Sequence, residues 1–196
     1  MTNDISPSTI AEDAKKNFDE LKNKLNKIKT ALLKEFDGRI IGMELLPPPR
    51  DTANGQKSEG DKKISTSFFI LMDDGDSKNV NIFALKDKIF LAAEKIIKET
   101  DNKVVPEVFL RSELVENCFD GKYEILNLIS LGAIIHDPTD MLSAIKISEV
   151  HKSMAIKKFD KYIVSYVAAG SLFRGEKSND IDVYIVGDDT DVKKMS

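Results

Sequence analysis

The sequence predicts an α/β (α+β) fold in which helices flank a mixed sheet. Apolar residues recur at three- and four-residue steps over several long stretches, as they do on the buried side of amphipathic helices. Short apolar runs bounded by Pro, Gly or Asp separate these stretches and predict strands. With 41% hydrophobic and 32% charged residues among 196, the chain can bury a core and keep a charged surface.

The longest predicted helix covers residues 9–36 and begins with a capping-box pattern, Thr9 and Glu12. Its apolar stripe consists of Phe18, Leu21, Leu25, Ile28, Leu32 and Phe36. Lysines gather in its middle, and we interpret them as a solvated face of mixed charge; a nucleic-acid contact is the less favoured alternative. Further helices are expected at residues 83–100, 112–119, 122–131 and 139–160.

Strands are expected in the apolar runs at residues 39–46, 64–72, 103–110 and 133–135. Pro47–Pro49 ends the first of them, because proline cannot donate a ladder hydrogen bond. For the same reason Pro106 predicts that the third strand lies at a sheet edge. Residues 50–63 are polar and contain glycine, which predicts a loop, and Asp73–Asp76 is interpreted as a solvated turn rather than a calcium site.

Charge and composition narrow the class of protein. The net charge is −4, so the strongly basic footprint typical of nucleic-acid-binding proteins is missing. Cys118 is the only cysteine and cannot form an internal disulfide, which favours a reducing compartment. No apolar run approaches the roughly 18 residues that a membrane span needs, and the N-terminus lacks the apolar segment of a signal peptide. We therefore expect a cytoplasmic protein with no membrane partner.

A pattern of helix, strand, loop, strand and acidic turn occurs twice. Residues 65–76 align with residues 180–191, since the apolar block and the Asp-Asp-x-Asp that follows it coincide. Upstream, Phe36-Asp37 and Phe159-Asp160 precede the first strand of each copy. The alternative is that any two amphipathic strands after helices look alike. A true repeat predicts a tandem duplication of one unit.

The two copies differ at the positions where chemistry is expected. Where the second copy has Gly170-Ser171, the first has Pro47-Pro48. The Asp-x-Asp at Asp180–Asp182 aligns with a Ser-x-Ser at Ser65–Ser67. Serine hydroxyls are poor ligands for a hard divalent cation, so we predict that the first copy is catalytically silent.

The second copy combines a glycine with two nearby carboxylates. Gly170 lacks a Cβ, which lets the backbone approach a phosphate, and Ser171 adds a hydroxyl donor. A short helix that starts there would present free N–H groups to an anion, and Arg174 would add positive charge. Asp180 and Asp182 are two residues apart at the start of a strand, so we expect both on one face. Paired carboxylates suit Mg²⁺, which shares them with substrate phosphates.

The spacing of Gly170-Ser171 and Asp180-Ile181-Asp182 between two strands resembles the signature of the nucleotidyltransferase superfamily typified by DNA polymerase beta, especially its small archaeal and bacterial members. The resemblance implies a mixed sheet flanked by helices, a nucleoside triphosphate donor and two-metal transfer of a nucleoside monophosphate. It assigns Asp180 and Asp182 to Mg²⁺ and to catalysis. It assigns Gly170, Ser171 and Arg174 to the nucleotide.

The family places a third carboxylate on a later strand, which has no counterpart before Ser196. We expect residues 1–150 to form a degenerate domain of this kind and residues 151–196 to begin a second one. The sequence therefore predicts a fragment of a longer protein, or a homo-oligomer or partner that completes the second unit.

The leading hypothesis is metal-dependent nucleotidyl transfer to an unknown acceptor, which is a nucleic acid, a protein or a small molecule. One alternative is a non-catalytic nucleotide- or RNA-binding module. Another is a scaffold whose N-terminal helix pairs with a partner. His136 and His151 are assigned no catalytic role, because a lone histidine is more often structural.

Overall fold

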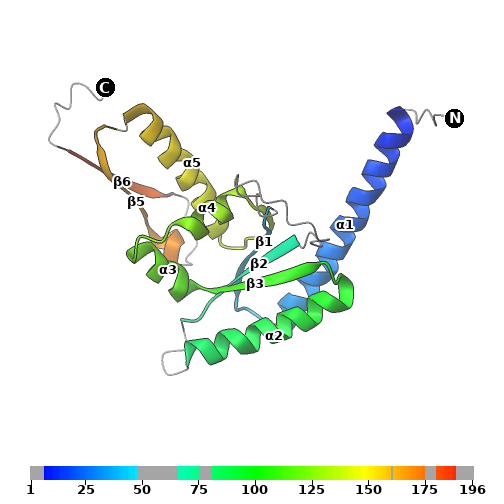
Figure 1. Cartoon of the computed structure of the whole chain (residues 1–196). Coiled ribbons are helices and arrows are strands. Elements are labelled where there is room, and N and C mark those ends of the chain that lie inside the picture. Colours follow the sequence, from blue (N-terminus) through cyan, green and yellow to red (C-terminus); the bar gives the residue numbers. More distant parts are fainter. Residues whose placement is uncertain (1–6, 48–65, 76–80, 160, 175–179, 189–196) are drawn as a thin grey trace, which may run out of the picture.

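A computed structural model describes residues 7–47, 66–75, 81–159, 161–174 and 180–188, without the side chains of residues 7–14, 172 and 174. Within these ranges it contains a four-stranded mixed sheet, a separate two-stranded hairpin and five α-helices (Figure 1). The helices are α1 (Pro7–Glu35), α2 (Ile82–Thr100), α3 (Arg111–Phe119), α4 (Glu124–Leu131), α5 (Met141–Phe159) and the 3₁₀ helix η1 (Ser171–Arg174). The strands are β1 (Ile40–Leu45), β2 (Thr66–Met72), β3 (Val104–Leu110), β4 (Ala133–His136), β5 (Ile163–Ala169) and β6 (Asp182–Gly187).

The elements expected from the sequence pattern up to α5 are all present, with ends within two residues of those expected. The expected turn after β2 is also present, since Gly75 N donates to Asp73 Oδ1 at 3.0 Å and Arg111 pairs with Asp73 at 3.1 Å. The loop expected at residues 50–63 lies outside the described residues. So do Pro48, Ser65, Asp76 and the acidic residues after Asp188.

The sheet has the strand order β3-β2-β1-β4. β2 and β3 run parallel and are joined by α2, whereas β1 is antiparallel to both β2 and β4. Pro106 lies on β3 at the edge of the sheet, so that prediction is confirmed. The sequence prediction of a mixed sheet flanked by helices is also confirmed.

Helices cover both faces of the sheet, which explains why its central strands carry nearly continuous apolar runs (Figure 1). On one face α1 and α2 contribute the buried side chains Ile28, Leu32, Ile89, Ala93 and Ile97. On the other, α3, α4 and α5 contribute Leu114, Ile125, Ile129, Met141, Leu142 and Ile145. Each such Leu or Ile stabilises the fold by roughly 1.5–3 kcal/mol relative to its exposed state.

Local signals set the helix ends. The Asn81 side chain caps α2 by accepting from two backbone N–H groups of its first turn, at 3.0 and 3.3 Å. Asp137 does the same before α5, where its carboxylate accepts from the N–H groups of Leu142 and Ser143 at 3.1 and 2.8 Å. Gly121 has a φ of +72°, which lets the chain turn between α3 and α4.

A charged pair lies in the core on the side covered by α4 and α5. Glu44 of β1 is fully buried, and Lys146 Nζ of α5 lies 3.0 Å from its Oε2. Lys146 also donates to the carbonyl oxygens of Ile129 and Gly132. Among the described residues, neither carboxylate oxygen of Glu44 has a well-aligned hydrogen-bond donor. Burial raises the pKa of Glu44 to about 7, although Lys146 acts in the opposite direction.

β5 and β6 form an antiparallel hairpin beside α5 (Figure 1). Its pairing repeats that of β1 and β2 position by position. Both ladders contain one register irregularity at the same place, between Ile40 and Gly42 in β1 and between Ile163 and Ser165 in β5. The equivalent facing pairs are Met43–Ile70 and Tyr166–Ile185, Glu44–Phe69 and Val167–Tyr184, and Leu45–Phe68 and Ala168–Val183.

The backbone hydrogen bonds at the outer ends of the two hairpins correspond as well. Asp73 N donates to Arg39 O at 2.7 Å, and Asp188 N donates to Tyr162 O at 2.9 Å. This correspondence uses the same alignment of residues 65–76 with residues 180–191 that the sequence suggested. The two hairpins therefore share a register as well as an apolar pattern.

α5 runs without a break across residue 150, where the sequence suggested a domain boundary. Its N-terminal half packs into the core of the first sheet through Met141, Leu142 and Ile145. Its C-terminal end leads directly to β5. The helix therefore belongs to both proposed domains, and the division itself stays a prediction.

Candidate functional site

The expected site residues lie at the end of the hairpin where Ala169 pairs with Asp182. Gly170 follows β5 directly, Ser171 begins η1, and Asp182 begins β6. Asp180 precedes β6 by two positions and is exposed. The structure brings Gly170 and Asp182 together and places Ser171 and Asp180 beside them along the chain.

Gly170 has a backbone conformation that side-chain-bearing L residues rarely adopt. Its φ is +122°. A Cβ built on it would lie 3.4 Å from Asp182 Oδ2 and 3.8 Å from Asp182 N. The glycine therefore allows the chain to leave β5 and keeps open the space beside the carboxylate.

The two carboxylates are placed differently by the fold. Asp182 is exposed and shares a strand face with Tyr184, because alternate residues of a strand point the same way. β6 begins only at Asp182, so strand alternation does not extend to Asp180, which the sequence expected on the same face. Within the described residues, no group of three or more His, Cys, Asp or Glu side chains is positioned to hold a metal ion.

The donor set at the hairpin end nevertheless fits Mg²⁺. This ion keeps several waters and usually takes one or two carboxylates together with substrate phosphates. Asp182 is exposed and has open space beside it at Gly170. Asp182 therefore has room beside it for an ion with its water and phosphate ligands, and the exposed Asp180, two residues before it, is the second candidate ligand.

η1 anchors the chain after β5 to the body of the protein. Phe173 packs against the core on the side of α3, α4 and α5. η1 has only four residues, so it is too short to supply the helix dipole that the sequence suggested for an anion. A phosphate contact here would depend on single backbone N–H groups and the Ser171 hydroxyl. The side chain of Arg174 lies outside the described residues.

A contact between His151 and Tyr166 joins the hairpin to α5. His151 Nδ1 lies 2.9 Å from Tyr166 Oη, and the ring centroids are 5.7 Å apart. Burial raises the pKa of Tyr166, and nearby Glu149 raises it further. The sequence did not reveal this partner of His151, because the pair lies on successive elements and follows no spacing rule within one element.

The corresponding end of the first hairpin has different groups. Ser67 stands where Asp182 stands in the second hairpin, and its neighbour on β3 is Val105. On β3, the strand that follows β2, Glu107 is the carboxylate nearest along the strand, and it lies beside Phe69 rather than beside Ser67. A serine beside a valine is a poor ligand environment for Mg²⁺.

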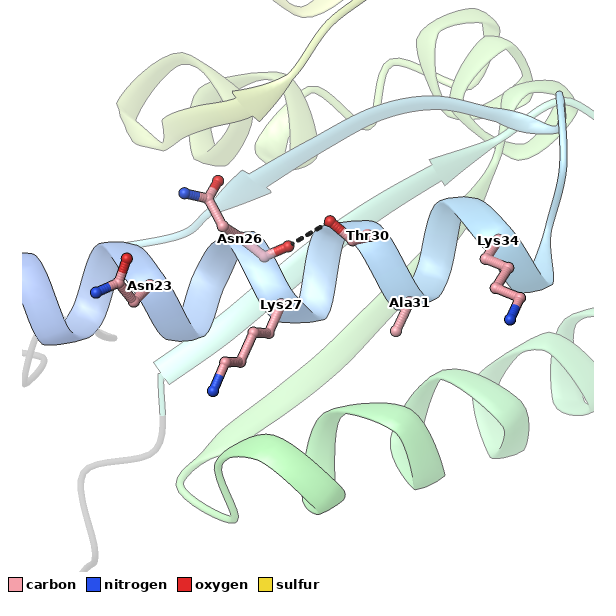
Figure 2. A pocket seen from close by; sticks show the side chains of 6 residues that line it. All are labelled: Asn23, Asn26, Lys27, Thr30, Ala31 and Lys34. Carbon is pink, nitrogen blue, oxygen red and sulfur yellow. Dashed lines mark hydrogen bonds between the residues drawn. The ribbon is translucent and has the colours of Figure 1, made fainter.

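A shallow surface depression lies along the C-terminal half of α1, away from the hairpin (Figure 1). Figure 2 shows its lining residues, Asn23, Asn26, Lys27, Thr30, Ala31 and Lys34. The hydroxyl of Thr30 donates to the Asn26 carbonyl oxygen at 2.8 Å, so the helix itself satisfies that group. The depression thus follows the polar side of α1, and we retain the interpretation of a solvated helix face.

Comparisons with protein-family models, with curated proteins and with solved structures each gave no match. In the part of the chain that the structure describes, no helix is long and apolar enough to cross a membrane.

Proposed function

We propose that this chain carries the phosphate- and metal-binding part of a metal-dependent nucleotidyltransferase. Such an enzyme transfers a nucleoside monophosphate from a nucleoside triphosphate to an acceptor. The observation that supports this best is the position of Gly170, at positive φ, next to the Asp182 carboxylate, which would lie 3.4 Å from a Cβ at Gly170. It joins the Gly-Ser and Asp-x-Asp motifs at one end of one hairpin.

Each residue has a role in this proposal. Asp180 and Asp182 hold Mg²⁺, which when bound would offset negative charge on the triphosphate and on the leaving pyrophosphate. The backbone at Gly170 and the hydroxyl of Ser171 contact phosphate oxygens, and Arg174 adds positive charge. The ladder pairing of Asp182 with Ala169 fixes the backbone that carries this carboxylate before substrate arrives, which lowers the cost of ordering the site.

We also propose that the two hairpins arose by duplication and that the first copy is silent. The shared irregularity and the matching facing pairs support this origin. The first copy keeps the hairpin but has Ser67 at the position of Asp182. The first copy therefore serves as a structural support, and α5, which packs in its core, connects it to the second copy.

A second candidate function is nucleotide or RNA binding without transfer. It is favoured by the finding that the described residues place two carboxylates, rather than three, near the hairpin end. The two functions share a site and differ only in whether the bound triphosphate is cleaved.

Calorimetry of the full chain with each of the four nucleoside triphosphates, with and without Mg²⁺, tests the site. A pyrophosphate-release assay on the same samples, with RNA, DNA and protein acceptors, then tests transfer. Mg²⁺-dependent binding with pyrophosphate release supports the transferase. Mg²⁺-dependent binding without release supports the binding module, and no binding to any triphosphate overturns both.

A further inference from the structure

The hairpin exposes apolar side chains at positions that its first-sheet counterpart buries. Val167, Tyr184 and Val186, here called the hairpin patch, are 46%, 61% and 51% exposed. They share a face, because Val167 pairs with Tyr184 and Val186 is two residues further along β6. The residues at the matching positions of β1 and β2 are Glu44, Phe69 and Leu71, each 0% exposed.

Helices cover these matching positions in the first sheet. Phe69 and Leu71 pack in one cluster with side chains of α3, α4 and α5. A two-stranded hairpin gains stability by burying an apolar face against another element, as every sheet layer does. The covering element that suits the hairpin patch is therefore an apolar helix stripe.

The N-terminal half of α1 presents such a stripe. α1 has 29 residues and is about 44 Å long. Ile28 and Leu32, in its C-terminal half, are 0% exposed, whereas Phe18 and Leu21 on the same stripe are 65% and 42% exposed. Figure 1 shows this half of α1 extending away from the body of the protein.

The stripe and the hairpin patch lie at opposite ends of the molecule (Figure 1). The buried C-terminal half of α1 fixes its direction, so the two surfaces cannot meet within one chain. They are able to meet between two chains. We propose that the N-terminal half of α1 docks on the hairpin patch of a second copy of this chain, and that the contact is reciprocal, which gives a closed two-fold dimer.

Charge at the rims of the two surfaces is complementary. Lys15 and Lys22 flank Phe18 three residues before and four residues after it, which places them beside the stripe, and both are exposed. Asp182 begins β6 and Asp188 follows its last residue, so the two flank the hairpin patch, and both are exposed. Opposite charges at an interface rim favour this pairing over a stripe-to-stripe contact between two lysine-rich helices.

Sedimentation and light scattering across a concentration series test the dimer, and they need no assumption about the proposed activity. The wild-type chain should reach twice its 21.9 kDa mass. Phe18→Ser and Tyr184→Ser should each weaken association at least tenfold. Phe83→Ser, which changes an aromatic residue 81% exposed on α2, is the matched control and should dimerise as the wild type does. Val186→Thr should also weaken association. Because threonine is β-branched and suits a strand, this loss would come from the changed surface rather than from unfolding of the hairpin.

Mixing the two defective variants gives the sharpest result. A heterodimer of Phe18→Ser with Tyr184→Ser has one intact helix–hairpin contact and carries both changes in the other contact. The second change costs little in a contact that the first has already broken, so the mixture should associate more tightly than either variant alone. A monomeric wild type at all concentrations overturns the proposal. So does normal dimerisation of Tyr184→Ser and Val186→Thr, which would indicate a stripe-to-stripe contact, and so does a mixture that stays monomeric.

Discussion

Glu44 of β1 and Lys146 of α5 form an ion pair inside the protein, with 3.0 Å between Oε2 and Nζ. The pair links the sheet to the helix that leads to the candidate site. At the matching position of the second hairpin the residue is Val167, so this hairpin geometry does not itself require a carboxylate there. Removal of one partner of a buried pair leaves the other uncompensated, which makes the pair a sensitive point of the fold.

Glu44→Gln should remove a pH dependence of stability. The folded-state pKa of Glu44 is about 7, above the ordinary 4.5, so the folded protein holds this proton more tightly than the unfolded chain. The contribution of this group to the free energy of unfolding is full below pH 4.5 and is lost as the pH rises through 7. Urea unfolding between these pH values should show a loss on the order of 3 kcal/mol for the wild type that the Glu44→Gln variant lacks. Equal pH slopes for the two proteins would contradict this.

Gly132→Ala should destabilise the protein through the same carboxylate. A Cβ at Gly132 would lie 2.6 Å from Glu44 Cδ, which is too close for an unstrained contact in a buried site. We expect a loss of about 1–3 kcal/mol in the free energy of unfolding. In the double variant Gly132→Ala with Glu44→Ala the overlap is relieved, so its loss should be smaller than the sum of the two single losses. Additive losses would show that the contact does not limit stability.

Gly170→Ala should lower nucleotide affinity. The φ of +122° disfavours any side chain, so alanine costs about 1–3 kcal/mol or shifts the backbone next to Asp182. Calorimetry should show at least about a tenfold loss in Mg²⁺-dependent triphosphate affinity. Gly121→Ala is the control, since its φ is +72° and its Cβ would meet nothing within 4 Å. If Gly121→Ala also lost triphosphate binding, the cause would be backbone strain in the protein as a whole rather than the change next to Asp182.

Asp180→Asn and Asp182→Asn should each abolish Mg²⁺-dependent binding and nucleotidyl transfer. Asp182 is exposed, so its replacement should change the free energy of unfolding by no more than about 0.5 kcal/mol. Asp188→Asn, at the other end of β6, is the matched control and should bind as the wild type does. Unchanged binding in both site variants would remove Asp180 and Asp182 from the proposal.

Tyr166→Phe should loosen the hairpin from α5. It deletes the hydroxyl that lies 2.9 Å from His151 Nδ1, at a cost of about 0.5–1.5 kcal/mol. Hydrogen exchange should become faster in β5 and β6, while β1 and β2 keep their protection. Adding His151→Phe should then cost little more, because the hydrogen bond is already lost. If His151→Phe lowered the stability by a further full amount in the Tyr166→Phe background, the two side chains would act separately.

The sequence predicted most elements because their apolar periods are long and their boundaries carry proline, glycine or capping residues. Pro106 even indicated the edge strand, since its constraint is local. Glu44 was not recognised as a buried charge, because an apolar strand with one carboxylate does not show where its counterion lies. Lys146 is about a hundred residues away along the chain, and only tertiary packing brings it to Glu44.

The sequence indicated one part of the candidate site and not another. The pattern of Gly-Ser and Asp-x-Asp indicated that Gly170 and Asp182 would be close, and the ladder places them together. The expected shared face of Asp180 and Asp182 assumed a strand that starts two residues earlier than β6 does. Strand ends depend on ladder hydrogen bonds with a partner strand, which composition alone does not specify.

The unbroken course of α5 has a consequence for synthesis of the chain on the ribosome. All strands of the first sheet and the helices α1 to α4 leave the exit tunnel before α5 does. Met141, Leu142 and Ile145, which pack in that core, leave the tunnel before β5 and β6 do. The strands of the hairpin follow α5 out of the tunnel, so the first sheet and its helices are available to support them when the hairpin forms.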